Sequence, residues 1–308
     1  MLLTGFILFV LGMLALDLGV FNRTPHEIRP REALAWTAVW VALAMLFAAG
    51  LALFAPAHSA LAFVTGYVLE ESLSIDNIFV IVLILDYFRV PRVCQHRVLF
   101  YGVLGALVMR GLFIGLGAAL LVRFDWVLYL FGALLVITAL RMAFRKEEAF
   151  NGDENAIVRF IRRVLPVSAN YDGKRFFTVE NGRRLATPML VVVILVEITD
   201  LIFAVDSIPA VFGVTRDSFV VFTSNIFAVL GLRSLFFVLA AVVDRFALLK
   251  YGLAVILAFI GAKMLASDVV HISTGVSLGV VLGVLALSIV ASAVRDARRR
   301  DAAPGGDG

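Results

Sequence analysis

Apolar residues in this chain occur in long runs rather than with the spacing of an amphipathic helix or a strand. Nine runs of 19 to 25 residues are predominantly apolar, and a helix of about 20 residues crosses a bilayer. The runs are residues 2–21, 33–54, 61–85, 98–121, 126–144, 189–212, 218–241, 246–265 and 273–293. This pattern predicts an all-α membrane protein with about nine transmembrane helices in one domain, residues 1–293. No Lys or Arg precedes the first run, so we expect a retained helix rather than a cleavable signal peptide.

The positive charges give the chain an orientation. Of 27 Lys and Arg residues, 21 lie in one set of alternate loops and the C-terminal tail, and two lie in the opposite loops. Because cytoplasmic loops carry the excess of Lys and Arg, we expect the N-terminus outside and the C-terminus inside. The basic balance is therefore a topology signal and gives no indication of a nucleic-acid partner.

Two of the apolar runs contain clusters of acidic and polar side chains. The clusters are Glu70, Glu71, Asp76 and Asn77 in the run 61–85, and Glu197, Asp200, Asp206 and Ser207 in the run 189–212. An ionised carboxylate at the bilayer centre costs about 2.5–3.5 kcal/mol on insertion scales. Six such groups need compensation from a bound cation, protons or buried arginines, so these clusters are the candidate functional site.

The two acidic runs also begin an internal repeat. Three pairs of segments match in the same order: Glu70 to Asp76 with Asp200 to Asp206, Arg110 with Arg233, and Arg141 with Lys263. Each unit holds three spans, residues 61–144 and 189–265, separated by a cytoplasmic linker, residues 145–187. An odd number of spans places the second unit upside down, the inverted arrangement typical of secondary transporters. Chance similarity between two apolar segments is the alternative.

In a straight helix, the acids of each cluster would not all point to one site. At about 100° per residue, Asp206 lies about 120° around the helix from Asp200, and Asp76 has the same offset from Glu70. A bent or unwound segment would bring these groups together, and Pro209 favours one in the second run. We therefore expect at least one broken acidic helix.

The side chains of the clusters offer only hard oxygen ligands. Asp17 in the first run is a further candidate ligand, or alternatively an interfacial residue. Oxygen ligands suit Mg²⁺, Ca²⁺ and Mn²⁺ rather than metals that prefer thiolate. Arg110 and Arg233 are candidate counter-ions that either neutralise one acid permanently or release it when metal arrives. Arg141 and Lys263 fall near the expected membrane faces, where long basic side chains reach the interface.

Three segments resemble the TerC family of integral membrane proteins, particularly its Alx-type bacterial members. They are residues 15–21, ALDLGVF, 70–79, EESLSIDNIF, and 197–210, EITDLIFAVDSIPA. The resemblance runs over roughly residues 1–293. It implies manganese export across the bacterial inner membrane, an association with tellurite resistance, and a place among the lysine-exporter-like transporters. Mn²⁺ would then be the transported substrate rather than a resident cofactor.

Three functions remain open from the sequence. The first is a secondary transporter that exports Mn²⁺ by alternating access, with proton coupling. The second is a non-transporting component of a metal-delivery or stress-resistance complex, and a protein partner or homo-oligomer stays open. The third, an intramembrane aspartyl protease using Asp76 and Asp206, is disfavoured because six carboxylates exceed its needs and no Gly-x-Gly-Asp segment occurs. We therefore do not expect an enzyme.

Two further segments carry expectations. Residues 155–165 are amphipathic and contain three arginines, which predicts either an interfacial helix on the inner leaflet or a solvated linker. The polar tail, residues 294–308, is expected to be disordered. The single cysteine, Cys94, excludes an intrachain disulfide.

Overall fold

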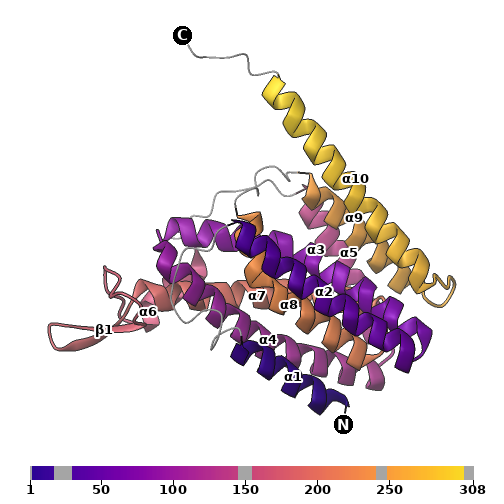
Figure 1. The fold of residues 1–308 in the computed structure, drawn as a ribbon, viewed down its shortest axis with the longest axis horizontal. Coiled ribbons are helices and arrows are strands. Elements are labelled where there is room, and N and C mark those ends of the chain that lie inside the picture. The colour runs from indigo at the N-terminus through magenta and orange to yellow at the C-terminus, as the bar shows by residue number, and fades with distance from the viewer. Residues whose placement is uncertain (1, 17–29, 145–154, 241–247, 302–308) are drawn as a thin grey trace.

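The computed structural model describes residues 2–16, 30–144, 155–240 and 248–301 and forms a bundle of helices (Figure 1). The helices are α1 (Leu2–Leu16), α2 (Pro30–Phe54), α3 (Ala57–Tyr87), α4 (Arg92–Arg123), α5 (Trp126–Phe144), α6 (Ala156–Val164), α7 (Pro188–Phe212), α8 (Ser218–Leu239), α9 (Leu249–Leu265) and α10 (Thr274–Asp301). Two short strands, β1 (Phe177–Glu180) and β2 (Arg183–Ala186), form an antiparallel hairpin. The predicted all-α class is confirmed.

Each of the nine predicted runs overlaps one helix, and α6 is the additional one. In the described part of the chain, six helices are long and apolar enough to cross a membrane: α2, α4, α5, α7, α8 and α10. The remaining three runs correspond to α1, α3 and α9. Three acids lie close together in the middle of α3, and α9 has only 17 residues, so crossing by these helices stays a prediction. The chain is thus a multi-pass membrane protein.

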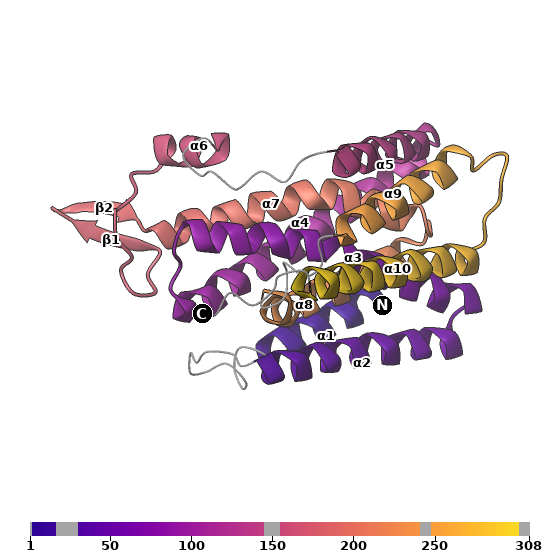
Figure 2. The ribbon, with the colours of Figure 1, turned by 90° about the horizontal axis from the view of Figure 1, so that it is seen from above.

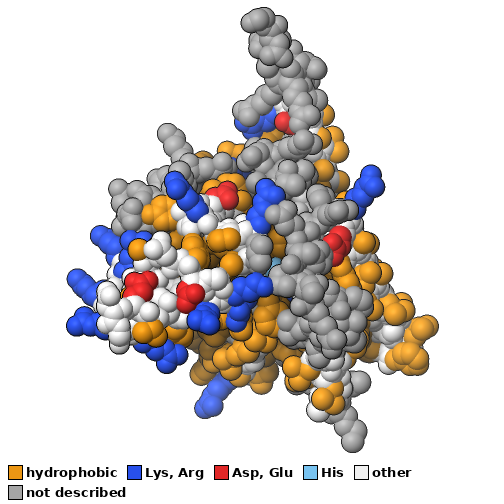
Figure 3. All heavy atoms as spheres, turned by 60° about the vertical axis from the view of Figure 1, so that its left-hand side comes forward, with side chains coloured by type: hydrophobic (Ala, Val, Ile, Leu, Met, Phe, Trp, Pro, Cys, Tyr) orange, Lys and Arg blue, Asp and Glu red, His pale blue; other side chains and the backbone are white. Residues whose placement is uncertain are grey.

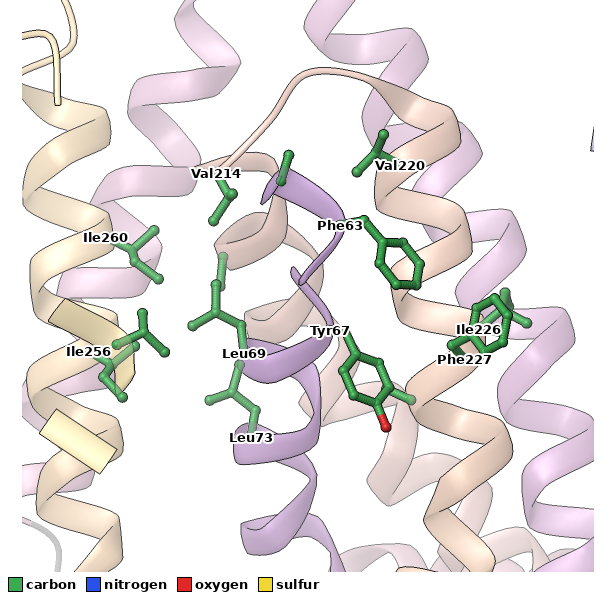
Figure 4. Packing of buried hydrophobic residues seen from close by; sticks show 14 of the residues in the cluster. Phe63, Tyr67, Leu69, Leu73, Val214, Val220, Ile226, Phe227, Ile256 and Ile260 are labelled. Atoms are coloured by element: carbon green, nitrogen blue, oxygen red, sulfur yellow. The ribbon is translucent and has the colours of Figure 1, made fainter. Parts of the chain in front are cut away.

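Helix α3 lies at the centre of the bundle. It contacts α2, α7, α8 and α10, while α4 packs on α7 and α8, and α5 packs along α9 (Figure 2). Phe63 and Leu69 of α3 are fully buried, against Phe227 of α8 on one side and Ile260 of α9 on the other (Figure 4). The acidic segment of α3 therefore follows directly on a packed apolar segment.

The outer surface of the bundle is apolar. Large hydrophobic side chains are more than half exposed on several helices, including Leu46, Leu112, Leu116, Val255 and Leu287. Hydrophobic side chains cover wide areas of the face shown in the space-filling view (Figure 3). Such a surface requires lipid around it, since exposed apolar patches of this extent are rare on soluble proteins.

Both acidic helices run without interruption, contrary to the expected break. Helix α3 continues through Glu70 and Asp76, and α7 continues through Asp200 and Asp206 with Pro209 one turn before its end. The prediction was wrong because it assumed that all the acids of one helix must point to the same site. In the structure, partners reach the acids from neighbouring helices instead.

The tail differs in part from its expectation. Helix α10 continues to Asp301, so residues 294–301 are helical rather than disordered, and residues 302–308 lie outside the described residues. The segment contains four arginines, which have high helix propensity, and it extends a helix that is already nucleated.

Of the two alternatives for residues 155–165, an interfacial helix or a solvated linker, the structure shows a helix, α6, and its place on the inner leaflet stays a prediction. The side-chain oxygen of Asn155 caps it by accepting from the backbone N–H groups of Ile157 and Val158 at 2.9 and 3.4 Å. The hairpin that follows was not predicted. Its turn, Asn181-Gly182, has φ angles of +51° and +74°, the conformation that favours Asn-Gly in two-residue hairpins. That dipeptide was the signal available in the sequence.

Helices α5 and α9 approach each other closely at two glycines. A Cβ on Gly261 would lie 2.8 Å from the Gly132 carbonyl oxygen and 2.9 Å from Val136 Cγ2. Conversely, a Cβ on Gly132 would lie 3.0 Å from the Gly261 oxygen. Small residues commonly permit such backbone contact between membrane helices.

We expect Gly261→Val to destabilise the protein by about 1–3 kcal/mol, because the added carbon atoms force the two helices apart. Thermal unfolding in detergent measures the effect. Gly115→Val in α4 is the matched control, since a Cβ there meets nothing within 4 Å. Equal melting temperatures for the two variants would contradict the packing argument.

Candidate functional site

The buried guanidinium of Arg110 joins the two acidic helices. Arg110 extends from α4 and is 1% exposed. Its Nε and Nη2 donate to the two carboxylate oxygens of Asp200 on α7 at 3.2 and 3.0 Å. Its Nη1 donates to Glu70 on α3 and to Asn225 Oδ1 on α8, the latter at 3.1 Å. One arginine therefore binds a carboxylate from each of the two predicted repeat units.

Two amides complete this network. Asn225 Nδ2 donates to Glu70 Oε2 at 2.9 Å, and Asn77 Nδ2 donates to Asp200 Oδ1 at 2.8 Å. All five side chains are buried. We call Glu70, Asn77, Arg110, Asp200 and Asn225 the Arg110 network. Two ionised carboxylates around one guanidinium leave a net negative charge inside the protein, and burying charge without compensation is costly.

Several buried side-chain oxygens have no hydrogen-bond partner among the described residues. Two of them are Asn77 Oδ1, within the network, and Ser207 Oγ on α7, and both residues are nearly inaccessible to solvent. Buried polar atoms are normally paired, so unpaired ones call for an explanation. The two residues occupy matching positions in the sequence repeat, directly after Asp76 and Asp206.

Two other predicted acids, Glu71 and Glu197, lie outside the Arg110 network and have different neighbours. Oε1 of Glu71 lies 3.1 Å from the position of a Cβ on Gly231 of α8. The carboxylate of Glu197 rests on Gly105 of α4, in the space where a side chain at that position would begin. Glu197 also lines an apolar hollow of about 510 Å³ between α4 and α7. Neither acid forms part of the Arg110 network.

Asp206 belongs to a third environment, between α5 and α7. Its Oδ1 accepts a hydrogen bond from Thr138 Oγ1 at 2.8 Å. Asp76 is partly buried, and Asp17 lies outside the described residues.

Arg233 does not share the surroundings of Arg110. It lines a small hollow of about 20 Å³ together with Trp36 and Trp40 of α2. Lys263, the repeat partner of Arg141, donates to Ser277 of α10 at 2.9 Å. The basic residues that match in sequence therefore differ in their contacts, so the two halves are not equivalent in this conformation.

No group of three or more Asp, Glu, His or Cys side chains is placed to hold a metal ion within the described ranges. The structure brings Glu70, Asn77 and Asp200 together, but Arg110 occupies the space between the two carboxylates. The full ligand set, Glu70, Glu71, Asp76, Asn77, Glu197, Asp200, Asp206, Ser207 and Asp17, stays a prediction.

The sequence marks one of the partner residues, Asn225, as a candidate for the site but does not mark the other, Thr138. Asn225 is a polar residue inside the apolar run 218–241, and such a residue suits an oxygen ligand or a hydrogen bond between membrane helices. Thr138 was missed. Threonine is common in membrane helices and bonds its own backbone there, as Thr65 does to Leu61 at 2.7 Å, so it carries no signal.

Comparison with known proteins identifies the family. The TerC family of integral membrane proteins matches residues 55–300. The chain belongs to the TerC family. It is 52% identical to the membrane protein STKORF319 of Myxococcus xanthus, over 94% of this chain and 91% of the relative. It is 48% identical to Alx of Escherichia coli strain K12, over 94% and 93%, whose name describes a candidate membrane-bound redox modulator. No solved structure matches the chain.

We expect Arg110→Gln to lower the stability of this TerC family protein by about 3–5 kcal/mol, because it leaves two buried carboxylates without their cation. Asp200→Asn alone should also destabilise. The double variant should lose less than the sum, since the interaction is shared. Melting temperatures of the four proteins in detergent form the cycle, and strictly additive losses would contradict the network.

Proposed function

We propose that this TerC family protein is a secondary transporter that exports a divalent metal, Mn²⁺, from the cytoplasm. The observation that carries the proposal is the Arg110 network, which buries two carboxylates and one cation between helices of both predicted repeat units. A site of this kind near the middle of the bilayer fits alternating access at the interface of the two units. The bacterial inner membrane and the N-out orientation belong to this proposal.

The helix contacts support the inverted repeat. If α3, α4 and α5 correspond to α7, α8 and α9, a pseudo-two-fold axis exchanges the pair α3–α8 with the pair α7–α4. Both pairs are in contact, and so are α3 with α7, α4 with α8 and α5 with α9. This is the contact pattern that such an axis generates. The differing environments of Arg110 and Arg233 then reflect one conformation of an asymmetric cycle.

The donors around the network fit Mn²⁺ as a substrate. Glu70 and Asp200 supply carboxylate oxygens, and Asn77 Oδ1 is a buried acceptor without a partner among the described residues. Hard oxygen sets of this type suit Mg²⁺, Ca²⁺ and Mn²⁺, and the choice of Mn²⁺ rests on the family resemblance. The structure holds Arg110 where an ion between the two carboxylates would lie.

Arg110 therefore acts as an internal competitor of the metal in the proposed cycle. When the guanidinium binds Glu70 and Asp200, it compensates part of their negative charge without metal. When a divalent ion arrives, Arg110 withdraws and the ion compensates the two carboxylates instead. Exchange of one cation for another keeps the cost of burying the acids low in both states. Of the two roles open for Arg110, this proposal chooses the gating role over permanent neutralisation.

The name of the E. coli relative raises a redox alternative, in which the protein modulates redox balance without moving metal. This chain has one cysteine, Cys94, which is buried, so it forms no disulfide within one chain. Control of a redox-active metal would give such an effect indirectly. The non-transporting, metal-delivery reading predicts binding without flux and is separated by the experiment below.

Purified protein in liposomes should move Mn²⁺, and Glu70→Gln or Asp200→Asn should reduce the flux at least about tenfold, the equivalent of 1.4 kcal/mol in the barrier. Glu180→Gln at the tip of the hairpin is the control and should leave flux unchanged. Mg²⁺ and Ca²⁺ as competitors rank selectivity. Metal binding without flux in the folded wild-type protein would reject the transporter and support metal delivery.

Arg110→Lys tests the competition. A lysine keeps the charge but loses the planar fork that binds two carboxylates at once. We expect the variant to bind Mn²⁺ more tightly at equilibrium, because the internal cation competes less well. Isothermal titration in detergent measures the affinity. Unchanged or weaker Mn²⁺ binding by a correctly folded variant would assign Arg110 a purely structural role.

A further inference from the structure

Only part of the apolar face of helix α6 is covered by the rest of the protein. Val158 and Ile161 are 1% and 4% exposed and pack in the cluster formed with α3, α4 and α7. Phe160 and Val164 are 66% and 60% exposed. Two large hydrophobic side chains one turn apart on a charged nine-residue helix therefore have no cover within the described chain.

The exposed pair lies beside the basic side chains of α6. At about 100° per residue, the apolar arc extends roughly 160° from Phe160 to Val158. Arg163 lies about 60° beyond Phe160, and Arg159 about 100° beyond it. The uncovered edge of the apolar arc thus borders the basic arc directly. This order of faces is typical of helices that lie in a membrane interface.

The position of α6 places this edge at the end of the bundle. Figure 2 shows α6 beside the first turns of α7, which is itself a candidate membrane span beginning at Pro188. The β1–β2 hairpin instead projects past the ends of the helices (Figures 1 and 2). In the predicted orientation, α6 therefore lies at the depth of the inner-leaflet headgroups, and the hairpin lies in the cytoplasm.

The net positive charge of residues 155–187 favours a negatively charged partner. Residues 155–187 carry seven Lys or Arg and two Asp or Glu. Blue side chains outnumber red ones at this end of the molecule (Figure 3). A hollow of about 600 Å³ adjoins α6, bounded by Arg162, Tyr171 and Pro188 among others, and has polar and apolar walls. An anionic group with an apolar tail matches both the helix and this hollow.

We propose that the outer face of α6 binds the anionic surface of the lipid bilayer. Phe160 and Val164 enter the boundary of the acyl chains, and Arg159 and Arg163 contact lipid phosphates. Juxtamembrane basic residues gain favourable energy from anionic lipids in this way. A second copy of the chain is the less suitable occupant, because a symmetric α6 contact would bring the arginines of both copies together. The proposal is independent of metal transport.

Site-specific fluorescence in reconstituted membranes tests the proposal. Phe160→Cys carries an environment-sensitive nitrobenzoxadiazole label, and Glu180→Cys at the hairpin carries the same label as the matched control. Cys94 is buried and should not react in the folded protein, and Cys94→Ala replaces it if it does. Vesicles contain phosphatidylcholine alone or with phosphatidylglycerol, and spin-labelled lipids serve as quenchers.

We expect the label at residue 160 to shift to shorter wavelength and to be quenched in vesicles with phosphatidylglycerol, but the label at residue 180 to remain unquenched. Arg159→Gln with Arg163→Gln, or high salt, should abolish most of the difference between the two lipid compositions. A label at 160 that stays solvent-exposed in both vesicles would overturn the proposal. A blue shift without lipid quenching, with energy transfer between copies, would overturn it in favour of a dimer.

Discussion

The ion pair that Arg110 makes with Glu70 and Asp200 constrains the whole bundle. Both carboxylates are buried, and an unpaired buried charge is costly, so the packing of α3 on α7 depends on the cation that lies between them. Asn225 donates a hydrogen bond to Glu70, and Asn77 donates one to Asp200. Four helices are thereby held in one register by polar contacts. Apolar packing between lipid-facing helices supplies no such register, because lipid solvates their surfaces equally well.

Different parts of the fold were predictable to different degrees. Nine helices followed from the apolar runs, since bilayer thickness sets the length of each, and α6 followed from its alternating apolar and basic positions. The hairpin was overlooked because strands of four residues carry almost no periodic signal, although Asn181-Gly182 marked its turn. The helical end of α10 was overlooked because a polar composition was taken for disorder.

The sequence predicted that buried acids need a compensating cation, but it did not predict which side chains contact each acid. The cost of burying acids indicated that a cation must compensate them, and the sequence offered Arg110 and Arg233 equally. Only the packing of α4 against α7 and α8 shows that Arg110 reaches Asp200 whereas Arg233 lies beside α2. The expected helix break failed for a related reason. Angles within one helix do not account for side chains such as Thr138 that meet an acid from a neighbouring helix.

The contact between Glu197 and Gly105 has a consequence for how the sequence can vary. A Cβ at residue 105 would overlap the carboxylate where it now lies, and that carboxylate is the far end of a flexible side chain beside the hollow between α4 and α7. An alanine at 105 would therefore turn Glu197 into that hollow before it disturbed the packing of α4 on α7. The residue at 105 thus helps to set where the Glu197 carboxylate lies.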